Sequence, residues 1–80
     1  MEWIITFFSH YGAVCFSKDA QAAGIHCTLA PVPRSLSASC GTCARVTADS
    51  IASIPLTEAD AVYRLENHRY QQVWQTANGS

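Results

Sequence analysis

The stretch Trp3-Ile4-Ile5-Thr6-Phe7-Phe8 decides which fold the chain can adopt. It is rich in β-branched and aromatic residues with apolar side chains at neighbouring positions, which is typical of a central strand covered on at least one face and well packed on the other. Ser9 follows as a predicted N-cap, because its hydroxyl can accept a hydrogen bond from the first helical turn. Apolar residues then recur at three- and four-residue spacings, which predicts a helix over 10–23 that ends at Gly24.

The rest of the chain predicts a second helix among three further strands. Thr57-Glu58-Ala59-Asp60 has the pattern of a helix start, with a threonine cap and two acids where the helix dipole favours negative charge. Apolar residues continue this pattern as a helix over 58–69. The other expected elements are strands over 25–30, 42–47 and 70–76, with a loop over 48–56. This order predicts an α+β fold, the ferredoxin-like split βαβ sandwich (β-α-β-β-α-β), with two helices on one face of a four-stranded antiparallel sheet.

The 80 residues suit one small domain, which we place at 1–76 with a frayed tail at 77–80. The formal charge is −1 and there is no basic run, so neither nucleic acid nor a membrane is an expected partner. The apolar start is too short for a signal peptide, which predicts a cytoplasmic protein whose four cysteines are reduced. Six large apolar residues exceed what one covered sheet face requires and predict a homodimer: Trp3, Phe7, Phe8, Val46, Val73 and Trp74.

Reactive chemistry is concentrated in the segment Pro31-Val32-Pro33-Arg34-Ser35-Leu36-Ser37-Ala38-Ser39-Cys40-Gly41-Thr42-Cys43. Its two early prolines withhold backbone donors, so it leaves the sheet as a stiff lead into small polar residues. Cys40 is therefore held by a rigid approach yet stays reachable, as a sulfur nucleophile requires. The residues predicted to assist this sulfur, through turn amides, hydroxyl donors or positive charge, are Gly41, Ser37, Ser39 and Arg34.

Several segments of the chain resemble the selenium/sulfur carrier-like proteins, a family of small bacterial proteins. The matching segments are Ile5-Thr6-Phe7, Ser9-His10, Leu29-Ala30-Pro31-Val32-Pro33-Arg34 and Ser37-Ala38-Ser39-Cys40-Gly41. The resemblance covers about 3–46 well and the last third only by its helix-then-strand order. It implies that Cys40 carries sulfur or selenium as a persulfide or perselenide. A donor such as a cysteine desulfurase, an unknown acceptor enzyme and no cofactor are the expectations that follow.

Cys43 leaves a second interpretation open, because Cys40-Gly41-Thr42-Cys43 has C-x-x-C spacing. Cys43 could be a resolving thiol for a Cys40 persulfide, half of a disulfide or half of a zinc site. The chain has no second C-x-x-C and its histidines are scattered, so further ligands would have to come across a dimer. Cys15 and Cys27 are predicted to be packing residues. Two readings therefore remain, a carrier that uses Cys40 without turnover of its own, and a dimeric interaction module with a redox-active or metal-binding C-x-x-C.

Overall fold

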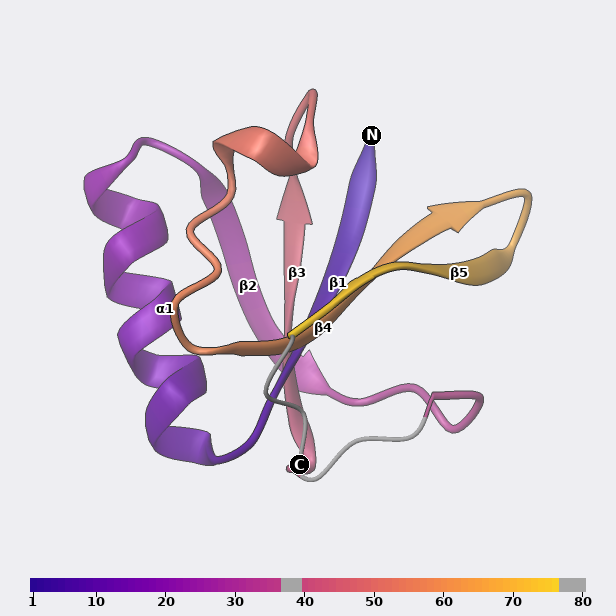
Figure 1. The fold of residues 1–80 in the computed structure, drawn as a ribbon, viewed down its shortest axis with the longest axis horizontal. Helices are drawn as coiled ribbons and strands as arrows, with labels where there is room; N and C mark the ends of the chain where they lie inside the picture. Colours follow the sequence, from indigo (N-terminus) through magenta and orange to yellow (C-terminus); the bar gives the residue numbers. More distant parts are fainter. Residues whose placement is uncertain (37–39, 77–80) are drawn as a thin grey trace.

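The computed structural model describes residues 1–36 and 40–76, which form an α-helix packed on a five-stranded sheet (Figure 1). Its strands are all antiparallel and lie in the order β2-β3-β1-β4-β5, so β1 is central. The tail predicted at 77–80 lies outside the described residues. In chain order the elements are β1 (Glu2–Phe7), α1 (His10–Ala22), β2 (His26–Pro31), β3 (Thr42–Thr47), the 3₁₀ helix η1 (Ile51–Ser53), β4 (Ala59–Glu66) and β5 (Arg69–Gln75).

The first half of the chain folds as its sequence predicts. β1 is a central strand, and the Ser9 hydroxyl caps α1 by accepting from the Gly12 amide at 3.2 Å. Gly24 takes the left-handed conformation after the helix, with φ of +75°. β2 lies at a sheet edge and β3 covers the predicted range 42–47. Within the described ranges no helix is long and apolar enough to cross a membrane, since α1 has 13 residues.

The predicted ferredoxin-like sandwich is wrong, because residues 58–69 form β4 and a turn instead of a second helix. β4 pairs with β1 along one edge and with β5 along the other, so the sheet satisfies its backbone groups on both sides. Val62 and Tyr63 also favour a strand. The acids that suggested a helix start, Glu58 and Asp60, flank the first residue of β4.

A two-residue turn joins β4 to β5 and completes the hairpin that replaces the predicted helix. Asn67 and His68 both have positive φ, at 53° and 64°. Positive φ at both central residues is the geometry of the type I′ turn, whose twist matches that of paired strands. β5 follows at once and forms the second edge of the sheet.

The main core lies between α1 and one face of the sheet. The rings of Phe7 on β1 and Phe16 on α1 meet there, with centroids 5.3 Å apart. The buried side chains of this cluster are Trp3, Ile5, Phe7, Ala13, Phe16, Ala20, Ala44, Val46, Ile54, Ala59 and Val62.

This core contains most of the apolar side chains that predicted a homodimer. Three of the six are core residues, and a fourth, Trp74, packs against the core. Phe8 and Val73 remain 46% and 39% exposed. The apolar surplus on the surface is therefore small, and the homodimer stays a prediction.

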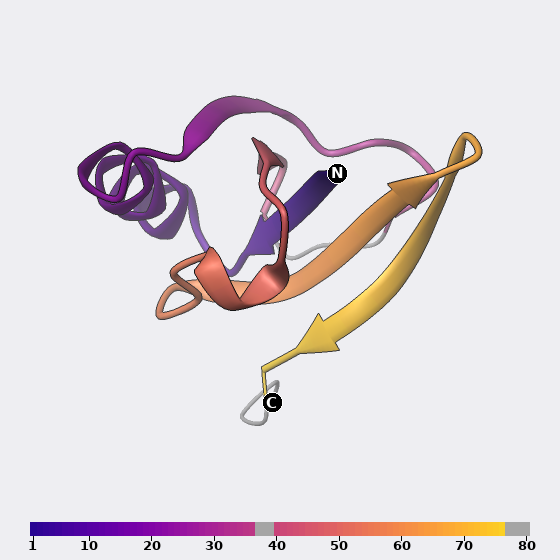
Figure 2. The same cartoon turned by 90° about the horizontal axis from the view of Figure 1, so that it is seen from above.

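The middle of the second face of the sheet, opposite α1, is also buried. Ile4, Thr6 and Cys43 lie on it and are fully buried. Figure 2 shows the segment after β2 running on the side of the sheet away from α1, toward the turn between β4 and β5. Leu36 of this segment and Tyr70 of β5 line one cavity. The described part of this segment therefore lies on the same side of the sheet as these buried side chains.

Candidate functional site

Cys40 lies at the end of the connection between β2 and β3, two residues before β3 begins. The Val32 amide donates to the Gly41 carbonyl oxygen at 3.0 Å, which extends the β2–β3 ladder past its last paired residues. The two ends of the connection are thus tied together next to the sheet. Cys40 is half-buried, so its side chain is anchored at its base and still partly open to solvent.

The Cys40 sulfur accepts a hydrogen bond from the Thr42 amide, at 3.4 Å. Thr42 is the first residue of β3, so the donor lies at the very end of a regular strand. A backbone amide directed at a sulfur stabilises negative charge on it more than it stabilises the neutral thiol. The sequence predicted turn amides from Gly41 for this role, and the structure assigns the contact to the next residue.

His10 belongs to the same end of the sheet, although its sequence position gave no sign of this. Its Nδ1 lies 3.3 Å from the Thr42 hydroxyl, so the start of α1 contacts the start of β3. The three histidines looked scattered because His10 and Thr42 are 32 residues apart in the chain. The available signal was the segment Ser9-His10, which is part of the family resemblance.

Cys43 points away from this group of residues and is fully buried on the second face of the sheet. Its thiol donates to the Pro31 carbonyl oxygen, at 3.6 Å. Burial raises the pKa of the Cys43 thiol above its ordinary value, and the positive charge of Arg45 opposes that rise. In this position Cys43 is a poor thiolate and is closed to a partner, so the two cysteines of the C-x-x-C are not equivalent.

The remaining predicted site residues are Arg34, Gly41, Ser37 and Ser39, and no hydrogen bond joins the described ones to the Cys40 sulfur. Arg34 and Gly41 are exposed, and Arg34 has no ion pair within the described part of the chain. Apart from its chain neighbours, a Cβ added at Gly41 would meet no atom of the described residues within 4 Å, so these residues do not demand glycine there. Ser37 and Ser39 lie outside the described residues.

Of the two other cysteines, Cys27 packs against the core, and the packing role of Cys15 stays a prediction. Burial raises the pKa of the Cys27 thiol, and a hydrogen bond with Ser17 partly offsets it. Cys15 is half-buried in α1, where its hydrogen bond with Tyr11 is the main cause that raises the pKa of that phenol. No group of three metal-ligating side chains is found in residues 1–36 and 40–76.

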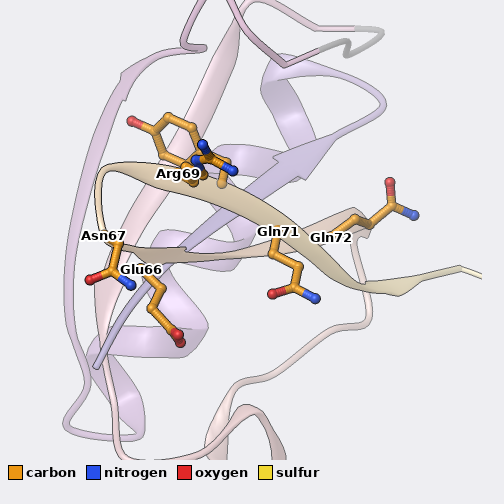
Figure 3. Close-up of a pocket in the computed structure, with 6 residues that line it drawn as sticks. Glu66, Asn67, Arg69, Gln71 and Gln72 are labelled. Carbon is orange, nitrogen blue, oxygen red and sulfur yellow. The ribbon is translucent and has the colours of Figure 1, made fainter.

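One cavity of the described residues does not adjoin Cys40. It lies along the β4–β5 hairpin and is lined by Glu66, Asn67, Arg69, Tyr70, Gln71 and Gln72 (Figure 3). The strand register places the β4–β5 turn beyond the start of β1, whereas Thr42 lies next to the end of β1. The cavity and the thiol are therefore at opposite ends of the sheet.

Residues 2–65 match the family described as "Putative Se/S carrier protein-like". The chain belongs to this family. The match includes Cys40, Thr42 and His10, and it ends just before the turn between β4 and β5. No curated protein and no solved structure matches the chain. The family resemblance seen in the sequence is thus confirmed, and the chain is a Se/S carrier-like protein by family membership.

Proposed function

We propose that this Se/S carrier-like protein holds sulfur or selenium on Cys40, as a persulfide or perselenide, and passes it between partner proteins. The observation that carries the proposal is the Thr42 amide directed at the Cys40 sulfur, at 3.4 Å. The contact suits a sulfur that must be anionic to attack a donor. The half-buried position of Cys40 at the end of a connection suits a thiol that meets another protein.

The proposed loading step is a transfer of a sulfane sulfur without net oxidation or reduction. The Cys40 thiolate attacks the terminal sulfur of a donor persulfide, which forms a new S–S bond on Cys40 and breaks the S–S bond of the donor. The donor cysteine leaves as a thiolate and takes up the proton that the Cys40 thiol released. Unloading to an acceptor thiol is the same exchange in the opposite direction, and a perselenide would react in the same way.

The proposed donor is a cysteine desulfurase, because that class of enzyme generates a protein-bound persulfide. The acceptor is a second protein with a nucleophilic thiol. We place the exchange in the cytoplasm, where thiols are kept reduced. Two of the other cysteines are less suited to receive sulfur, since Cys43 is fully buried and burial raises the pKa of the Cys27 thiol.

Intact mass spectrometry after incubation with a cysteine desulfurase and cysteine tests this proposal. We expect a gain of one sulfur atom that a reductant removes and that Cys40→Ser abolishes. Cys27→Ser is the matched control and should load like the wild-type protein, because it removes a thiol that packs against the core. Repeating the reaction with selenocysteine tests selenium. An unmodified Cys40 under conditions that load a known carrier would refute the proposal.

A further inference from the structure

We infer that His10 is a positioning residue for Cys40, acting through Thr42. The inference rests on the proposed function, because it names the residue that prepares the carrier thiol for attack. Two contacts carry it, from the His10 ring to the Thr42 hydroxyl at 3.3 Å and from the Thr42 amide to the Cys40 sulfur at 3.4 Å. Side chain and backbone of the same threonine thus join the histidine to the thiol.

Both ends of this connection sit on regular structure. His10 is the first residue of α1, and the Ser9 cap fixes the turn in which it lies. Thr42 is the first residue of β3 and pairs with Pro31 at the end of β2. Neither residue is buried, so a role in core packing does not account for their contact.

The effect on Cys40 follows from the position of Thr42 at the end of its strand. A strand end frays unless a further contact holds it, and the contact between the His10 ring and the Thr42 hydroxyl holds the residue whose amide faces the sulfur. With the ring in place, the amide keeps its direction and stabilises the thiolate. Without it, Thr42 samples orientations in which the amide turns to water, and the thiolate loses this donor.

The experiment measures the rate at which iodoacetamide alkylates Cys40, resolved from the other cysteines by peptide mass spectrometry. Only the thiolate reacts, so the rate reports the state of the sulfur without a donor enzyme. We expect His10→Ala and Thr42→Val each to slow alkylation by about three- to tenfold, the value of one hydrogen bond. The double variant should be no slower than either single one, because both changes break the same connection.

Conservative variants separate positioning from a general structural effect. Thr42→Ser keeps the hydroxyl and His10→Asn keeps a polar nitrogen near the Nδ1 position, so both should retain most of the rate. The matched control is His26→Ala, which removes an exposed histidine that pairs with Thr47, at the far end of β3. It should alkylate like the wild-type protein. Thermal unfolding of each variant verifies that the fold is intact.

The inference is overturned if His10→Ala alkylates at the wild-type rate, if the two single effects add in the double variant, or if the conservative variants are as slow as the disruptive ones. These outcomes are independent of sulfur loading. If the variants show the expected alkylation rates but the wild-type protein accepts no sulfur, the carrier function alone is refuted. A protein that loads sulfur on Cys40 equally well with alanine or histidine at position 10 would refute the role of His10 alone.

Discussion

The Cys43 thiol donates a hydrogen bond to the Pro31 carbonyl oxygen, with 3.6 Å between sulfur and oxygen. Cys43 pairs with Ala30 and Pro31 pairs with Thr42, so the two residues are diagonal neighbours across β2 and β3. The hydrogen bond lies where the proline-rich segment leaves the sheet. Cys43 is therefore held by a hydrogen bond on a buried face of the sheet, whereas Cys40 is half-buried in the connection before β3. The C-x-x-C spacing alone does not distinguish the two cysteines.

Replacing Cys43 by alanine should leave sulfur loading on Cys40 intact and lower the free energy of unfolding by about 1 kcal/mol. The loss reflects a small cavity and an unfilled acceptor at Pro31. Urea unfolding and intact mass after incubation with a desulfurase check the two parts. Loss of loading in this variant, or a wild-type mass lower by two hydrogens that requires both cysteines, would instead support the redox reading of the pair.

Stability should fall at alkaline pH because two thiols are held protonated. Burial raises the pKa of Cys27 and of Cys43 above the ordinary value of 9.0. Below about pH 9 both thiols stay protonated whether the chain is folded or unfolded. Above it they ionise first in the unfolded chain, which favours unfolding, so their contribution is lost as the pH rises.

Urea unfolding under reducing conditions between about pH 7.5 and pH 10 measures this dependence. The variant that combines Cys27→Ala and Cys43→Ala should lose less stability over this range than the wild-type protein. Cys40→Ala is the matched control, since its half-buried sulfur lies at the end of a connection, and it should keep most of the wild-type slope. Equal slopes for the double variant and the wild-type protein would contradict the prediction.

A glycine at position 68 should stabilise the β4–β5 hairpin. His68 has φ of 64°, and a residue with a Cβ pays about 1 kcal/mol for that conformation. His68→Gly creates Asn-Gly, the preferred pair for this turn, and should raise the free energy of unfolding by about 0.5–1 kcal/mol. His68→Ala removes the same imidazole but keeps the Cβ, so it should bring no gain. Equal stability of the two variants would show that the turn is not strained.

The first half of the fold could be predicted because its signals are local. A serine cap, a three- and four-residue apolar spacing and a glycine at the end define α1 within a few residues, and helix hydrogen bonds join residues four apart. The reachable position of Cys40 likewise follows from the prolines that precede it. The family could be recognised from the same segments.

The prediction for the second half was wrong because two local signals indicated a helix. The acids beside Ala59 suit a helix start, and the apolar residues that follow fit a helical stripe as well as a strand. Asn67-His68 was a weak sign of the hairpin turn, since asparagine tolerates positive φ. Helix and strand could be told apart here only by the strands that lie on either side of β4.

By itself the sequence determined the central strand and the capped helix, because each depends on neighbours in the chain. The tertiary structure alone decided that residues 59–66 join the sheet, that Cys43 is buried and that His10 reaches Thr42. These features depend on partners far away in sequence: β4 pairs with β1 and Thr42 lies 32 residues from His10. Strand pairing and burial are contacts between distant segments, so no local pattern of residues specifies them.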